Sequence, residues 1–194
     1  MEWDRGTDIA FDATPQSDGR PASMPMDQPE PQNWYAVQTR IRHEKAVRDR
    51  LIGQGITTFL PLVNEIHRWN DRKQKVEVPL FGCYLFVCLL AKSEEFSRVR
   101  RVAGVVHLLG CQGMATPIPE VQIAAVRTVL ACSVPCYPYP FLKSGQRVRV
   151  RGGALDGVEG IFVSRSGDNT VVISVSAIQR SLAVRVSGYD LERI

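Results

Sequence analysis

The stretch FGCYLFV, residues 81 to 87, restricts the fold of this chain more than any other feature. Short apolar runs rich in aromatic and β-branched residues are typical of buried strands. From Tyr84 to Leu89 every position is apolar, so the alternating side chains of such a strand make both of its faces apolar. One face must meet the protein's own core. The other needs a second partner, which is either another layer of the same chain or another molecule.

The segments around this strand predict an α+β domain over residues 33–131. Periodicity, charge spacing and turn residues indicate strands at 34–38, 56–60, 63–69 and 75–78, and helices at 43–54, 93–101 and 119–130. The polar residues between the third and fourth of these strands are typical of a hairpin that leads directly into FGCYLFV. The order of elements describes an antiparallel sheet flanked by helices.

The rest of the chain divides into a tail, a linker and a second domain. Residues 1–32 contain five prolines and almost no periodic apolar pattern, so we expect them to be disordered. Residues 132–142 place proline at short intervals and predict a semi-extended linker. Residues 143–194 contain five short strands separated by glycines, a pattern typical of a small all-β barrel.

Charge is distributed unevenly over these parts. Residues 1–32 carry seven acidic and two basic residues, a net charge of −5. Residues 33–142 carry fourteen basic and eight acidic residues, and residues 143–194 carry eight basic and five acidic residues, so the remainder has a net charge of +9. A basic folded part favours a polyanionic partner. Basic residues near the first helix are also compatible with an ordinary solvated helix face.

Several functional classes are disfavoured by what the sequence lacks. No nucleophile elbow, Walker or dinucleotide-binding motif occurs, and the three histidines are not at metal-ligand spacing with cysteine. We therefore expect no enzyme activity, no cofactor and no metal. No apolar stretch approaches the roughly 20 residues that span a bilayer, and five scattered cysteines suit a reducing compartment. These features predict a cytoplasmic protein without a membrane partner.

Two stretches in this order resemble the NusG family of transcription elongation factors. The run WYAV at 34–37, the helix after it and PLFGCYLFV at 79–87 are similar to the N-terminal domain of that family. The segment VRVRGGALDGVEG at 148–160 resembles the KOW motif that opens its C-terminal barrel. One position departs from the family pattern, because Gly82 stands where proline is usual. Glycine permits the bend before Tyr84 without making it rigid.

The resemblance implies a fold and a binding mode. The fold is an antiparallel sheet flanked by helices, followed by an SH3-like KOW barrel. In the family, a concave aromatic patch on the N-terminal sheet docks on the clamp helices of RNA polymerase. The positions that match this patch are Gln38, Phe81, Tyr84 and Phe86. The alternative is that these aromatic residues form an ordinary core on both sides of the strand.

Further contacts follow from the same resemblance. The second helix would meet the opposite jaw of the polymerase cleft through Glu95, Phe96, Ser97 and Arg98. The displaced non-template DNA strand would lie near Arg40, Arg42 and Lys45. The barrel would recruit Rho or a small-subunit ribosomal protein through Leu155, Val158 and Ile178. Its β-branched strands and many glycines disfavour a helical alternative, so we expect a folded barrel that moves freely on its linker.

The resemblance therefore predicts a monomeric bacterial elongation or antitermination factor that raises the processivity of RNA polymerase. The sequence PLF..YLFV and the short connection from Gly110 to Pro117 indicate a specialised paralogue that serves particular operons. Two alternatives stay open, a housekeeping NusG that couples polymerase to Rho or the ribosome, and an RNA-binding or ribosome-associated KOW protein. A ribosomal protein has no need of the two-sided aromatic strand and would normally be more basic.

Overall fold

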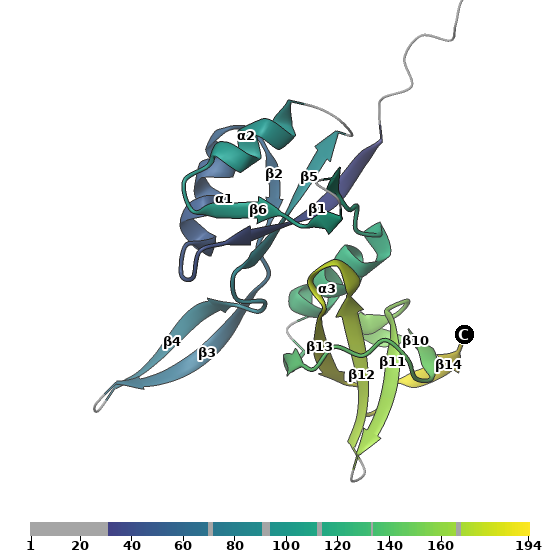
Figure 1. Ribbon diagram of the computed structural model, residues 1–194. Coiled ribbons are helices and arrows are strands. Elements are labelled where there is room, and N and C mark those ends of the chain that lie inside the picture. Colours follow the sequence, from purple (N-terminus) through teal and green to yellow (C-terminus); the bar gives the residue numbers. More distant parts are fainter. Residues whose placement is uncertain (1–30, 70–71, 91–93, 112–113, 133, 166–167) are drawn as a thin grey trace, which may run out of the picture.

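The computed structural model describes residues 31–69, 72–90, 94–111, 114–132, 134–165 and 168–194 (Figure 1). The segment expected to be disordered, the tip of the expected hairpin at residues 70–71 and the expected helix start at Ser93 lie outside the described residues. Gln32, which was placed in the tail, is the first residue of strand β1. Among the described residues, no helix has both the length and the apolar character needed to cross a membrane.

FGCYLFV leads into a central strand of an antiparallel sheet (Figure 1). The sheet has the strand order β2-β5-β1-β6, so the apolar strand β5 lies between two neighbours. Its strands are β1 (Gln32–Thr39), β2 (Thr57–Phe59), β5 (Tyr84–Leu90) and β6 (Val105–Leu108). All three pairings are antiparallel, as the order of elements predicts.

Both faces of β5 are covered by helices of the same chain. Helices α1 (Glu44–Gly53) and α2 (Glu95–Arg101) pack on the face that carries Leu85 and Val87. Helix α3 (Glu120–Ala131) packs on the opposite face, where Phe86 is fully buried. The second partner of this strand is therefore another layer of the chain itself along most of its length.

The predicted hairpin is confirmed and projects away from the sheet (Figure 1). Strands β3 (Leu62–Trp69) and β4 (Arg72–Pro79) pair over their full lengths and form a separate two-stranded sheet. A second, much shorter pair, β7 (Gly110–Cys111) with β8 (Met114–Ala115), lies between β6 and α3 in the chain. The helix predictions are confirmed to within two residues at each end.

The C-terminal strands form one six-stranded antiparallel sheet in the order β14-β10-β11-β12-β13-β9. Two short 3-10 helices interrupt it, η1 (Gly153–Leu155) and η2 (Ser176–Ile178). The strands are β9 (Cys136–Tyr139), β10 (Arg147–Arg151), β11 (Glu159–Arg165), β12 (Asp168–Val175), β13 (Arg180–Arg185) and β14 (Asp190–Arg193). We refer to residues 136–194 as the C-terminal β unit.

The linker prediction was wrong over residues 136–139, which form the edge strand β9. Pro138 lies opposite Leu182 in the register of β9 with β13. Proline has no N–H to donate to a neighbouring strand. An edge strand tolerates proline because one of its two sides has no neighbouring strand. The proline spacing therefore excluded a helix correctly without excluding an edge strand.

The C-terminal β unit also packs against α3 and is not free on a linker, contrary to expectation (Figure 1). Buried residues of α3, such as Ile123 and Val126, belong to the same apolar cluster as Val171 and Leu182 of the β unit. Helix α3 thus has apolar neighbours on two sides, the sheet of β1 and β5 on one and the C-terminal β unit on the other. Apolar burial of this kind favours the docked arrangement.

Candidate functional site

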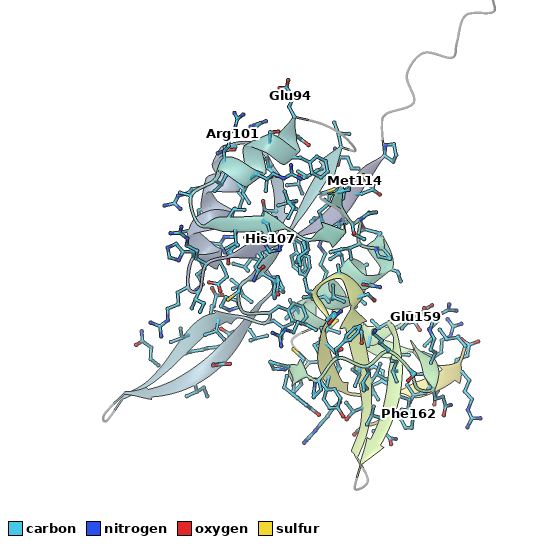
Figure 2. The ribbon with its side chains drawn as sticks, in the orientation of Figure 1. Glu94, Arg101, His107, Met114, Glu159 and Phe162 are labelled. Carbon is cyan, nitrogen blue, oxygen red and sulfur yellow. The ribbon has the colours of Figure 1, made fainter. Side chains whose placement is uncertain are left out.

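One row of side chains stays partly exposed at the end of the sheet face that α3 covers. Gln38 of β1 lies opposite Tyr84 of β5 and opposite His107 of β6. Directly opposed residues of an antiparallel pair share a face. Tyr84 and Gln38 are half-buried, and His107 is exposed (Figure 2). We call Gln38, Tyr84 and His107 the sheet-end row.

The other two residues of the predicted aromatic patch lie beneath the surface. Phe86 is 0% and Phe81 is 3% exposed, and their rings meet edge to face with centroids 6.3 Å apart. Phe86 also stacks on Phe59 of the neighbouring strand, with centroids 6.1 Å apart. The expectation that Phe81 and Phe86 contact a partner directly does not fit this arrangement, because α3 and the sheet enclose them. They form the core beneath Tyr84.

The turn before Tyr84 is held by hydrogen bonds and not by the proline usual in the family. Glu44, a buried residue in the first turn of α1, accepts a hydrogen bond from the Cys83 N–H at 2.8 Å. The Thr39 N–H donates to the Cys83 carbonyl at 2.8 Å, and the Tyr84 N–H donates to Phe81 at 3.1 Å. Cys83 itself has φ of 67°, the left-handed region. The conformation that Gly82 leaves free is thus specified by Glu44 and β1.

Sequence reasoning missed two residues near this face. His107 was considered only as a metal ligand, and it is the strand register that brings it to Gln38. Arg127 of α3 places its guanidinium 4.5 Å from the Trp34 ring centroid and 5.0 Å from that of Phe59. Such cation–π contacts fix α3 on the sheet. No local signal in the sequence links Arg127 with either ring, since the contacts span more than sixty residues.

Of the four predicted contact residues of helix α2, two are partly buried and two are exposed. Glu95 accepts a hydrogen bond from the Leu90 N–H at 3.3 Å, and the Phe96 ring meets Tyr35 edge to face at 4.9 Å. Both side chains are partly buried. Ser97 and Arg98 are exposed, although the Arg98 guanidinium donates to the Gln54 carbonyl. Only Ser97 and Arg98 are therefore presented fully to a partner.

The three predicted DNA contacts also differ in their surroundings. Arg40 and Arg42 are exposed on the turn between β1 and α1, where Arg42 has φ of 63°. The Lys45 ammonium donates a hydrogen bond to the Glu77 carbonyl at 2.8 Å and so connects α1 to strand β4. Lys45 is exposed, yet part of its donor capacity is already used within the chain.

The residues predicted to bind a partner of the C-terminal unit are buried. Leu155, Val158 and Ile178 are 1%, 5% and 5% exposed, so they do not form an exposed edge in this arrangement. The resemblance had placed them at a contact with a partner of the barrel. Instead η1, which ends at Leu155, packs beside α3, where the Cys132 thiol donates to the Ala154 carbonyl at 3.0 Å.

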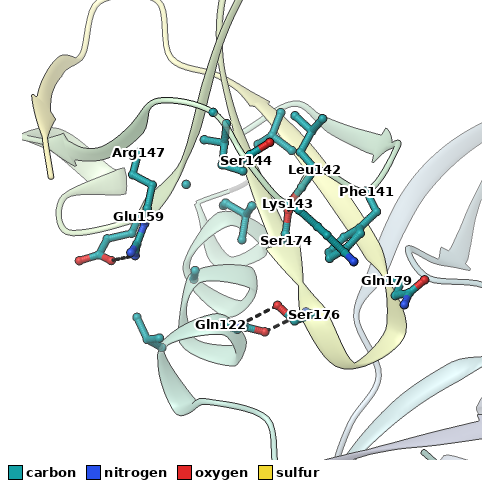
Figure 3. A pocket seen from close by; sticks show the side chains of 17 residues that line it. Gln122, Phe141, Leu142, Lys143, Ser144, Arg147, Glu159, Ser174, Ser176 and Gln179 are labelled. Atoms are coloured by element: carbon teal, nitrogen blue, oxygen red, sulfur yellow. Dashed lines mark hydrogen bonds and ion pairs between the residues drawn. The ribbon is translucent and has the colours of Figure 1, made fainter.

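Helix α3 and the C-terminal β unit are joined by a pair of polar contacts (Figure 3). The Ser176 N–H donates to Gln122 Oε1 at 3.1 Å, and Gln122 Nε2 donates to Ser176 Oγ at 3.4 Å. A cavity of about 790 Å³ opens beside them, between α3, the segment from Phe141 to Gly145, and strands β11 and β12. The arginines of the KOW-like segment are paired, Arg149 with Glu159 at 2.5 Å and Arg151 with Glu192 at 2.5 Å.

The surroundings of one arginine and two cysteines raise their pKa values. The hydrogen bond to Glu159 and its charge raise the pKa of Arg149 above its ordinary value. Burial raises the pKa of the Cys136 thiol in β9, and burial is also the main cause that raises the pKa of Cys88 in β5. A thiol with a raised pKa is less often the nucleophilic thiolate at neutral pH.

The family model and the curated relatives that match this chain carry the same name. The family model described as NusG, transcription termination factor, matches residues 32–127. The transcription termination/antitermination protein NusG of Borreliella burgdorferi is 27% identical over 183 residues, which cover 83% of this chain and 98% of that protein. The protein of the same name from Lactococcus lactis is 23% identical over 175 residues, covering 84% and 94%. A solved structure on domain interaction in Thermotoga maritima NusG is 18% identical, covers 82% of this chain and 97% of that one, and has a TM-score of 0.48.

Proposed function

This chain belongs to the NusG family of transcription termination/antitermination factors, and from that premise we propose that it binds RNA polymerase through the sheet-end row. The bound factor raises the processivity of transcription and performs no chemistry of its own. It acts by differential binding, because a protein that bridges both jaws of the cleft disfavours the opened, paused polymerase. Its place is then in the bacterial cytoplasm, as a monomer on the enzyme.

The observation that carries this proposal is the half-buried Tyr84, which lies beside Gln38 and packs on the core that contains Phe81 and Phe86. The rest of the α3-facing sheet surface is covered, so a partner can reach this face only at its end. Aromatic side chains in partly desolvated surroundings dominate many protein interfaces. Phe81 and Phe86 support Tyr84 from below, and Glu44 holds the turn before it. The patch inferred by resemblance thus becomes a contact layer of Gln38 and Tyr84 above a buried layer of phenylalanines.

The second polymerase contact is proposed at the exposed side of α2. Ser97 and Arg98 are the outward residues of the predicted set, whereas Glu95 and Phe96 position the helix. The displaced non-template DNA strand would lie near Arg40 and Arg42, whose exposed guanidinium groups suit phosphate contacts. Lys45 contributes positive charge there while it keeps its bond to Glu77.

Rho or a small-subunit ribosomal protein remains the proposed partner of the C-terminal β unit. Because Leu155, Val158 and Ile178 are buried in this arrangement, a partner that uses them requires the unit to rearrange first, and η1 with Leu155 would have to leave α3. The specialised-paralogue interpretation rests on the PLFGCYLFV stretch and the short connection that forms β7 and β8. A housekeeping factor would have the same polymerase contacts, so only its range of target operons distinguishes it.

The test of polymerase binding uses the full chain and core RNA polymerase in a co-purification with titration. Tyr84→Ala and Gln38→Ala together should weaken binding about 30-fold, because a hot-spot aromatic contributes about 2 kcal/mol. Tyr137→Ala is the matched control, since Tyr137 is 42% exposed on β9 and away from this sheet. Phe86→Ala does not serve, because emptying a buried phenylalanine site costs about 3–5 kcal/mol of stability.

Two results would contradict the proposal. One is a Gln38 and Tyr84 double variant that keeps its thermal stability and binds core polymerase like the parent chain. The other is a parent chain that co-purifies with ribosomes or RNA and not with polymerase, which would favour the RNA-binding alternative.

A further inference from the structure

Among the described residues, five exposed arginines without a carboxylate partner lie on and around helices α1 and α2. The Arg50 guanidinium donates to the Ala103 carbonyl at 2.5 Å, and that of Arg98 donates to the Gln54 carbonyl. These bonds fix the side chains without neutralising them. Arg40 and Arg42 are exposed on the turn before α1, where the Arg40 N–H donates to the Gly104 carbonyl of the turn after α2. Arg101 is exposed at the end of α2 (Figure 2). We call these five residues the arginine face.

No carboxylate in the part of the chain that the structure describes forms an ion pair with these five arginines. Asp49 is paired with Arg48 at 2.8 Å, and the buried Glu44 is bonded to the Cys83 N–H. Glu94 and Glu95 lie at the start of α2, one turn before Arg98, and Glu95 accepts a hydrogen bond from the Leu90 N–H. By contrast, Arg149 and Arg151 of the C-terminal β unit each have a glutamate partner. The arginine face is thus left with five guanidinium charges to be balanced by something else.

We propose that the acidic segment preceding β1, residues 1–30, binds the arginine face of its own chain. This segment carries seven acidic and two basic residues, so its net charge of −5 matches the five arginines. Docking of the segment is independent of the proposed function. Its consequence, competition with the non-template DNA strand for the arginine face, rests on the proposed function.

The length of the segment allows this contact. It joins the fold at the start of β1, and the eight residues of that strand separate the junction from Arg40. At about 3.4 Å per residue this separation is about 27 Å. Thirty residues of chain can span up to about 100 Å, so the length of the segment is sufficient to reach the arginine face.

Tethering makes a weak electrostatic contact effective. A segment of the same chain has an effective concentration of about 1 mM at a nearby site. Non-specific protein–DNA binding has a dissociation constant of about 0.1 mM at its weak end, and we take this value for the acidic segment. These values give about tenfold competition against DNA. Exposed charges are screened by salt, so the competition should fade as ionic strength rises.

The test compares three full-length proteins. Asp8→Asn, Asp12→Asn, Asp18→Asn and Asp27→Asn together reduce the segment charge from −5 to −1, and Arg5→Gln with Arg20→Gln changes it to −7. At low salt, the backbone amide resonances of residues 40–42 and 98–101 should shift between the parent and the first variant. The difference should disappear at about 1 M salt, where the screening length is about 3 Å. A labelled single-stranded oligonucleotide should bind the first variant about tenfold more tightly and the second more weakly than the parent.

The two readouts separate this inference from the proposed function. Unchanged amide resonances at the arginine face, or changes confined to the β3–β4 hairpin or the C-terminal β unit, overturn the inference. Shifted resonances without oligonucleotide binding by any of the three proteins support docking of the segment and contradict the DNA contact in the proposed function. If the resonances shift but all three proteins bind the oligonucleotide with the same affinity, the segment does not compete with DNA and that part of the inference is wrong.

Discussion

At the level of single residues, Gly160 of β11 packs tightly against Val171 and Val172 of β12. A Cβ atom built there would be 2.5 Å from Val171 Cγ1 and 2.7 Å from the Val172 carbonyl oxygen. The second contact is backbone, so the neighbour cannot yield without disturbing the sheet. We expect Gly160→Ala to lower the free energy of unfolding by about 1–3 kcal/mol, as overpacked sites do. Urea denaturation followed by circular dichroism measures this loss.

Gly53→Ala is the matched control for that measurement. Gly53 is the last residue of α1, and a Cβ there would meet no atom within 4 Å. Alanine loses less conformational entropy in a helix than glycine, so this variant should be unchanged or more stable by up to about 1 kcal/mol. Equal stability of Gly160→Ala and the parent would mean that β11 and β12 lie further apart than the structure shows.

At the scale of elements, helix α3 is held between the N-terminal sheet and the C-terminal β unit. Gln122 makes both hydrogen bonds to Ser176 across the second of these contacts. A net hydrogen bond contributes about 0.5–1.5 kcal/mol. We therefore expect Gln122→Ala to raise the undocked population by about tenfold or more, with the unfolding midpoint nearly unchanged. Amide resonances of η1, which packs on α3, should shift and broaden.

Val121→Ala controls for a change at the neighbouring position of α3. Val121 is 54% exposed and lacks the bonds of Gln122, so its replacement should leave the η1 resonances in place. Identical η1 resonances in the Gln122→Ala protein would show that apolar contacts alone hold the C-terminal β unit on α3. The same measurement on a sample with core polymerase would report whether docking on polymerase opens this contact.

At the scale of the whole molecule, charge is divided between an acidic N-terminal segment and a basic remainder. Charge reversal by Arg40→Glu and Arg42→Glu should weaken crosslinking to non-template DNA in an elongation complex and leave polymerase docking nearly intact. Exposed charges mainly influence encounter and salt dependence. Lys45 is left unchanged, because its replacement would also remove the bond to the Glu77 carbonyl. The apparent affinity for DNA should also become less dependent on salt.

The control for this pair changes the net charge equally at a distance. Arg180→Glu and Arg193→Glu lie on β13 and β14 of the C-terminal β unit, where both side chains are exposed. This variant should retain the crosslink. Equal loss in both variants would indicate that overall charge, and not the position of Arg40 and Arg42, attracts the DNA.

Local patterns in the sequence predicted the three helices and most of the strands, and the resemblance of two stretches indicated the family. Periodicity located the three helices to within two residues, and the apolar run correctly predicted a strand with two buried faces. Those features depend on neighbours a few residues away, since side-chain period and turn preference are short-range properties. The KOW-like glycines likewise mark real turns, as positive φ at Gly152 and Gly157 shows.

Only the tertiary structure decided which residues of the candidate site reach the surface. Phe86 and Leu155 are both apolar residues beside exposed positions, and their burial follows from α3, which lies more than twenty residues away in the sequence from each. His107 joins Gln38 through strand register, and β9 joins the sheet through an edge that tolerates proline. Exposure is a property of packing between distant segments, and no local pattern specifies it because the same apolar residue satisfies a core and an interface equally well.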